Sequence, residues 1–206
     1  MCVHTAQVEA LRALLAPTGW VERTRDFAGA LRRRSRTPQG LLVVGTADDE
    51  PWHMTAHLAD ESRLAGLPEL EPTLVRWAPP PGAPPHLAVG IERLERAGRA
   101  ETLLVVSVQA APAALLQRVA DARKAGTAIF ALDQGDPELD DLAHEALEVP
   151  AGQCPVSFDG AQHLVSLAVG ETATGGRGAA TAPSGLAAAR GRLARLLDTL
   201  SGTPVD

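Results

Sequence analysis

Three short runs made almost entirely of apolar residues constrain what this chain can fold into more than any other feature. They occupy residues 41–44, 102–108 and 127–132. A strand with one face in water alternates apolar and polar side chains, whereas a strand covered on both faces does not. The runs therefore predict strands that are buried on both sides, as in a parallel sheet between two layers of helices.

Segments with the apolar spacing of helices lie between and around these runs. We expect helices over residues 21–34, 51–64, 87–97, 112–126 and 158–169, a helical turn at 139–143, and shorter strands at 73–77 and 146–149. Strands that alternate with helices are joined by right-handed parallel crossovers. The sequence thus predicts an α/β fold with a three-layer, doubly wound, five-stranded parallel sheet, whose ligands bind beyond the C-terminal strand ends.

The sequence predicts further segments at both ends of the chain. Residues 8–15 place apolar side chains on one helical face, which predicts an additional N-terminal helix. Residues 171–185 are rich in glycine, threonine and alanine and predict a flexible linker. Leucines between 186 and 200 predict an amphipathic helix. We therefore expect an α/β domain over 1–170 that includes the N-terminal helices, a linker over 171–185, and a C-terminal helical segment over 186–206.

Composition narrows the classes of partner and mechanism. The net charge of −6 provides no general attraction to nucleic acids or anionic membranes. The basic segment at 32–36 ends a predicted helix, where positive charge is favourable in any case. Two cysteines are too few for a disulfide framework, and no apolar run approaches the ~20 residues that span a bilayer. We expect a cytoplasmic protein without membrane or nucleic-acid partners.

The order of segments resembles a sugar isomerase (SIS) domain. The strand at 103–107 is followed by a loop, a helix ending in Ala122-Arg123-Lys124-Ala125-Gly126, the strand at 127–132, a short helix, and a strand closing in Val149-Pro150. The strand at 41–44 with the following Gly45 is similar to the strand that precedes the family's glycine-rich loop. The resemblance implies a SIS-like sheet with flavodoxin-like strand order, and homo-oligomers with sites at subunit interfaces.

Among SIS proteins the chain is most similar to the phosphoheptose isomerase branch, in which a helix after the first strand carries His-x-x-x-Glu. Here that motif is His57 and Glu61, which a helix places on one face. In that branch such a pair binds zinc and transfers protons during aldose–ketose isomerisation, so the resemblance implies His57 and Glu61 as catalytic residues. The sequence does not identify a cofactor, and a divalent metal such as zinc is the candidate.

Further candidate metal ligands extend this row. His53 lies one helical turn before His57, and the late helix, which carries a Gln and a His in that branch, has Gln162 and His163 here. The candidate metal ligands are thus His53, His57, Glu61, Gln162 and His163. Adjacent helix positions diverge by about 100°, which argues against Gln162 and His163 entering one site together. The competing interpretation is a solvated polar helix face.

Both phosphate loops of the resembled family are altered in this chain. The predicted ligand-binding residues at the strand ends are Gly45, Thr46, Asp48, Asp49, Ser107 and Gln109. A carboxylate ~4 Å from a phosphate costs roughly 4 kcal/mol at a near-surface dielectric, while a helix end supplies only about half a positive charge. The acidic residues at 48–50 are well explained as a favourable helix N-terminus, and a cation or amino-bearing ligand attracted there is the alternative.

These observations favour a SIS-like binding or regulatory module for a sugar-phosphate-like or related small ligand, rather than an efficient isomerase. One alternative is a metal-dependent phosphosugar aldose–ketose isomerase that uses His57 and Glu61. Another is a structural interaction protein that displays the helix at 186–200 on its linker.

Overall fold

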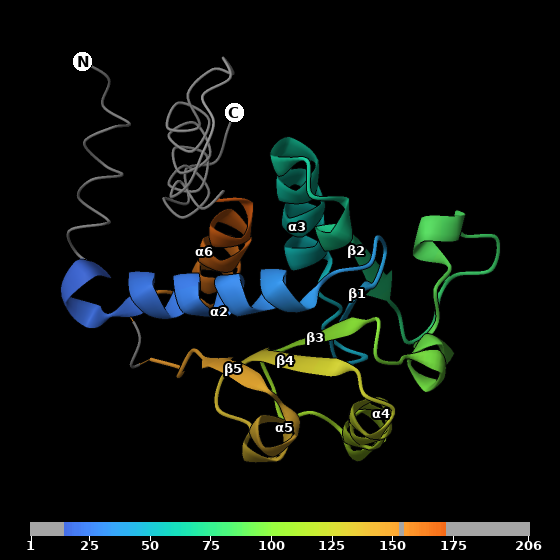
Figure 1. The fold of residues 1–206 in the computed structure, drawn as a ribbon. Helices are drawn as coiled ribbons and strands as arrows, with labels where there is room; N and C mark the ends of the chain where they lie inside the picture. The colour runs from blue at the N-terminus through green and yellow to red at the C-terminus, as the bar shows by residue number, and fades with distance from the viewer. Residues whose placement is uncertain (1–14, 153–154, 172–206) are drawn as a thin grey trace, which may run out of the picture.

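A five-stranded parallel sheet lies between two layers of helices in the structure, a computed structural model that describes residues 15–152 and 155–171 (Figure 1). The strands are β1 (Leu41–Val44), β2 (Pro72–Val75), β3 (Thr102–Ser107), β4 (Ala128–Asp133) and β5 (Glu145–Glu148), in the order β2-β1-β3-β4-β5. Every neighbouring pair is parallel. The predicted fold class and the flavodoxin-like strand order are confirmed.

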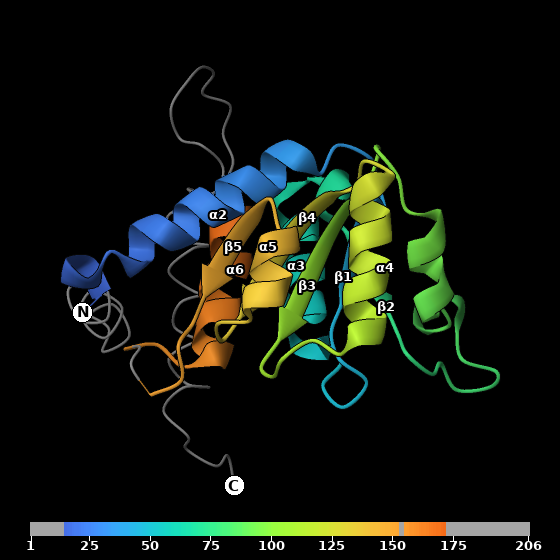
Figure 2. The ribbon, with the colours of Figure 1, turned by 90° about the horizontal axis from the view of Figure 1, so that it is seen from below.

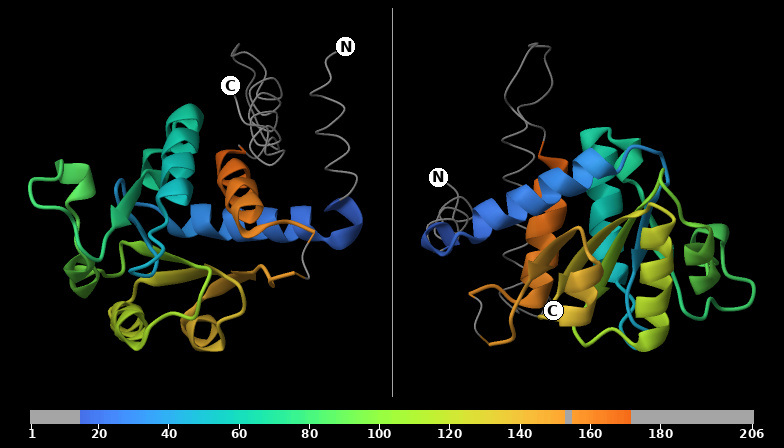
Figure 3. Two further views of the ribbon diagram at one scale, coloured as in Figure 1. Left: turned by 180° about the vertical axis from the view of Figure 1, so that it is seen from behind. Right: turned by 60° about the horizontal axis from the view of Figure 1, so that its bottom comes forward.

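The helices divide between the two faces of the sheet. One layer contains α2 (Trp20–Arg34), α3 (Trp52–Ala65) and α6 (Phe158–Gly170), and the other contains α4 (Ala113–Lys124), α5 (Pro137–Leu142) and the 3-10 helix η4 (Ile91–Arg96). Figure 2 shows α4 and α5 in front of the strands, and Figure 3 shows α2 and α6 on the opposite side. Shorter 3-10 helices are η1 (Ala16–Thr18), η2 (Pro68–Leu70) and η3 (Pro85–Leu87).

Alternate residues of the central strands fill two separate cores. Leu41 and Val43 of β1 pack in the core under α2, α3 and α6, whereas Leu42 and Val44 pack in the core under α4, α5 and η4. All four are fully buried. The apolar runs lack alternation because each face of the strand meets its own layer of helices.

The helix predicted over 87–97 was wrong. The segment forms η3 and η4, separated by Gly90 in an extended conformation. The backbone N–H of Arg76 donates to the carbonyl of Val89 at 2.9 Å, and Arg76 and Gly90 form an isolated parallel bridge. Since this stretch pairs with the extension of β2, its backbone is not available for a continuous helix.

The basic segment at 32–36 contributes a contact between two helices. The Arg32 guanidinium donates to the carbonyls of Ala168 at 3.1 Å, Val169 at 2.6 Å and Glu171. These carbonyls end α6, where backbone acceptors lack helical donors and the helix dipole is negative. Arg32 therefore fastens the C-terminus of α6 to α2.

Some predictions concern residues outside the described ranges. They are the N-terminal helix as far as residue 14, almost all of the linker at 171–185, and the helical segment at 186–206. No helix in the described part of the chain is long and apolar enough to cross a membrane.

Candidate functional site

A cleft lies at the C-terminal ends of β1 and β3. The loop after β1 enters α3 on one face of the sheet, and the loop after β3 enters α4 on the other face. The two loops therefore diverge at this point, as they do at the ligand-binding edge of doubly wound sheets. The cleft has a volume of about 360 Å³ and is lined by Thr46, Ala47, Asp48, Trp77, Gln109, Ala110, Pro112 and Ala114. Three of the six predicted ligand-binding residues, Thr46, Asp48 and Gln109, thus surround one cavity.

A second hollow of about 480 Å³ shares one wall with this cleft. Asp49, Glu50, Trp52 and Arg76 line it, together with residues common to both hollows, among them Asp48 and Trp77. The indole N–H of Trp77 donates to the carbonyl of Gly45 at 2.8 Å. This bond anchors the Trp77 ring between the two hollows.

The charged side chains around the hollows include one ion pair and two exposed carboxylates. Arg76 is the only cation among the residues that line them, and its Nε lies 2.8 Å from Glu50 Oε2, with both side chains largely buried. The Arg76 guanidinium also lies 4.5 Å from the centroid of the Trp52 ring. Asp48 and Asp49 are exposed. The rim is therefore acidic, because its single cation already has a carboxylate partner.

Two predicted ligand residues shape the loops and do not line the hollows. A Cβ at Gly45 would lie 2.2 Å from the carbonyl of Asp49 and 2.8 Å from Pro51 Cδ, so this turn has no room for a side chain. Ser107 is fully buried and its hydroxyl donates to the carbonyl of Gln109. Gly45 and Ser107 therefore hold the loops on which the lining residues stand.

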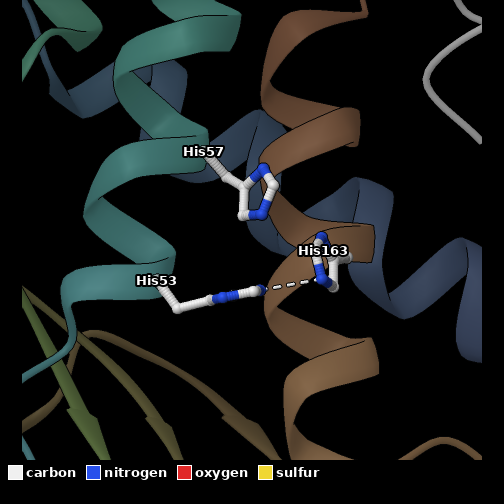
Figure 4. A group of neighbouring side chains, drawn as sticks. All are labelled: His53, His57 and His163. Carbon is white, nitrogen blue, oxygen red and sulfur yellow. Dashed lines mark hydrogen bonds between the residues drawn. The ribbon is translucent and has the colours of Figure 1, made fainter. Parts of the chain in front are cut away.

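Three histidines form a cluster between α3 and α6 (Figure 4). One ring nitrogen from each histidine lies within 4.8 Å of one from each of the others, and Nε2 of His53 is 2.8 Å from Nε2 of His163. The ring centroid of His57 lies 4.2 Å from that of His163 and 4.6 Å from that of His53. His53 is exposed, His57 is half-buried and His163 is buried. The cluster thus opens to solvent on its His53 side.

The environment favours neutral rings at two of these positions. Burial, followed by repulsion from His57 and His53, lowers the pKa of His163 to about 4. Burial and the neighbouring His53 also lower the pKa of His57. Desolvation disfavours the charged imidazolium, and crowding of like charges acts in the same direction.

The other two predicted metal ligands point elsewhere. Glu61 is buried farther along α3, and a Cβ at Gly170 of α6 would lie 2.1 Å from its Oε2. Gln162 Nε2 donates to Asp159 Oδ1 at 3.2 Å. The structure therefore gathers three of the five predicted ligands, and Gln162 and His163 do diverge.

Sequence reasoning missed Trp77 and Arg76 beside the cleft. Both directly follow β2, whose C-terminal end lies at the same sheet edge as the predicted ligand residues. That position was the available signal, since carboxyl ends of parallel strands share one edge.

Sequence reasoning also missed a carboxyl pair formed by Asp133 at the end of β4 and Asp140 of α5. Asp133 Oδ2 and Asp140 Oδ1 are buried, and neither has a hydrogen-bond donor among the described residues while both groups are ionised. Burial, the charge of Asp133 and a hydrogen bond with Asp133 raise the pKa of Asp140 to about 6. A protonated Asp140 can donate a hydrogen bond to the Asp133 carboxylate, which agrees with the raised pKa of Asp140.

Comparisons with known proteins bear on the fold. No protein-family model and no curated protein matches the chain. A solved structure from Silicibacter pomeroyi DSS-3, provisionally named a phosphosugar isomerase, matches with a TM-score of 0.53 and 18% identity over 94% of this chain and 54% of that one.

Two further solved structures match with lower scores. A provisionally named phosphosugar isomerase from Salmonella typhimurium LT2 has a TM-score of 0.49 and 12% identity over 73% of this chain and 43% of that one. The sugar isomerase domain of an RpiR transcription factor from Sphaerobacter thermophilus has a TM-score of 0.48 and 14% identity over 94% and 98%. This chain thus spans about half the length of the two phosphosugar isomerase structures.

The strand order and the match to the Silicibacter pomeroyi structure agree on the architecture. The chain therefore has the α/β fold of sugar isomerase domains.

Proposed function

We propose that this protein is a SIS-like module that binds a carbohydrate derivative or a related small ligand in the cleft at the ends of β1 and β3. The observation that carries the proposal is this cleft, at the point where the strand order reverses and ligands of doubly wound sheets bind. Its wall combines an indole with a hydroxyl, an amide and a carboxylate. Such a mixture of one aromatic surface and a few polar groups is typical of sites for small polar molecules.

The chemistry of the lining defines the ligand further. Gln109 offers an amide donor and acceptor, and Thr46 offers a hydroxyl, which suit the hydroxyl groups of a sugar. Asp48 is exposed at the rim, and Arg76 is held by Glu50. A phosphate would meet carboxylates without a free cation among the lining residues. We therefore infer that a neutral or amino sugar binds more tightly than its phosphate ester.

Isothermal titration with three matched ligands tests this proposal. Glucosamine, glucose and glucosamine 6-phosphate differ in charge but share one ring. We expect glucose or glucosamine to bind measurably and more tightly than glucosamine 6-phosphate. Gln109→Ala should bind the sugar about tenfold more weakly, because it loses a hydrogen bond of about 1.4 kcal/mol.

A matched control uses another exposed glutamine. Gln117 lies on α4 and bonds Asp121, away from the cleft lining. Gln117→Ala should bind as the unmodified protein does. Failure of any sugar, amino sugar or sugar phosphate to bind would remove the ligand-binding function, and equal effects of the two variants would remove the assignment to this cleft.

The geometry supports binding better than turnover. The isomerase alternative requires His57 and Glu61 to face one substrate, yet His57 lies with two other histidines and the Glu61 carboxylate lies against Gly170. Turnover of heptulose or hexose phosphates by the metal-loaded protein would favour the alternative. Homo-oligomerisation and an interaction role for 186–206 stay predictions, which the mass of the chain with and without residues 172–206 would test.

A further inference from the structure

We propose that His53, His57 and His163 form a binding site for a transition-metal ion such as Zn²⁺ between α3 and α6. This ligand set differs from the one that the phosphoheptose isomerase resemblance implies. It excludes Glu61 and Gln162, which the structure directs toward Gly170 and Asp159. The proposed site therefore rests on three imidazoles and on no carboxylate ligand.

The distances suit a single ion. Zinc–nitrogen bonds of about 2.0–2.1 Å in a tetrahedron place two ligand nitrogens roughly 3.3 Å apart. One nitrogen from each ring lies within 4.8 Å of one from each of the others, and Nε2 of His53 is 2.8 Å from Nε2 of His163. These separations lie on either side of the spacing that one ion needs, and the exposed side chain of His53 has room to adjust toward it.

Two packed helices hold the ligands in place. His53 and His57 lie one turn apart on α3, and a helix keeps such positions on one face. His163 comes from α6 and is buried, so its surroundings fix its ring. Asp60 and Asp159 act electrostatically on His57 and His163, and their negative charge favours a cation nearby.

The donor atoms indicate which metal binds. Imidazole suits Zn²⁺, Cu²⁺, Ni²⁺ and Co²⁺, whereas Mg²⁺ and Ca²⁺ prefer oxygen ligands. Three protein ligands also leave one position of a tetrahedron for water or another small ligand. Because the cluster opens on the His53 side, that position would face solvent.

Metal titration of the full chain after treatment with a chelator tests the proposal. We expect one Co²⁺ per chain, seen as visible absorption of a four- or five-coordinate ion, and its displacement by one equivalent of Zn²⁺. His53→Ala should weaken Zn²⁺ binding at least tenfold in competition with a chromophoric chelator. His53 is exposed, so this variant should keep the fold, whereas His163→Ala is informative only alongside an unchanged circular dichroism spectrum.

His86→Ala is the matched control, because His86 is an exposed histidine outside the cluster. It should bind Zn²⁺ as tightly as the unmodified chain. Absence of saturable binding at one ion per chain overturns the proposal, and so does equal affinity in His53→Ala and His86→Ala. Gln109→Ala should retain the metal, which separates this site from the proposed sugar cleft.

Discussion

The carboxyl pair at the end of β4 makes folding stability depend on pH in an unusual direction. Burial, and then the charge of the fully buried Asp133, raises the pKa of Asp140 from its ordinary value of 3.8 to about 6. Between these two pH values the folded state holds a proton that the unfolded state has released. The contribution of the pair to stability is therefore present below about pH 4 and is lost as the pH rises to 6.

The size of the effect follows from the shift. The difference between 3.8 and about 6 corresponds to roughly 3 kcal/mol at 1.36 kcal/mol per pKa unit, an upper limit because Asp140 is only partly buried. Asp140→Asn removes the charge, and its amide N–H can donate to Asp133 Oδ2. We expect this variant to be up to about 3 kcal/mol more stable than the unmodified protein at pH 7.5, and about equally stable at pH 4.

Urea unfolding at pH 4, 5, 6 and 7.5, followed by circular dichroism, measures the difference between the two proteins. Asp26→Asn, at an exposed position of α2, is the control and should show no comparable trend. A difference that stays constant with pH, or a variant that becomes less stable as the pH rises, would refute the raised pKa of Asp140 as its cause.

Three further substitutions test the loops and the helix contacts, each by urea unfolding. Gly45→Ala should destabilise the protein by about 1–3 kcal/mol, because the new Cβ would overlap the carbonyl of Asp49; an unchanged midpoint would contradict this close approach. Arg32→Ala should cost about 2 kcal/mol by releasing the end of α6, whereas the neighbouring exposed Arg33→Ala should cost little. Arg76→Ala should cost about 3 kcal/mol because it leaves the largely buried Glu50 carboxylate without a cation, with only the N–H groups of Trp52 and Trp77 as donors; additive losses in the double variant with Glu50→Gln would argue against their pairing.

Most of the fold could be predicted from local patterns. The run at 41–44 has no polar residue, and the run at 102–107 has polar residues only at its two ends, Thr102 and Ser107. Both faces of these strands meet helices, and that signal is contained in the sequence itself. The segment at 87–97 has the spacing of a helix, yet Val89 pairs with Arg76 of another segment. Such a long-range backbone pairing overrides local preference and cannot be seen in the spacing.

The candidate site was only partly predictable for the same reason. The row of His53 and His57 follows from helix geometry, which repeats every turn. Whether His163 or Gln162 faces that row depends on how α6 rotates against α3, a property of packing between helices. Trp77 gave no motif, and its role depends on the shared edge of β1, β2 and β3.

The contact between His53 and His163 spans 110 residues of sequence. Between them lie β2, β3, β4 and β5, so the two imidazoles meet only when α6, the final described helix, docks beside α3. During synthesis His53 is made first, and four of the five strands follow it before His163 is made. A spectroscopic probe of this cluster would therefore report the docking of α6 beside α3, and it would remain silent in a nascent chain that ends between β5 and α6.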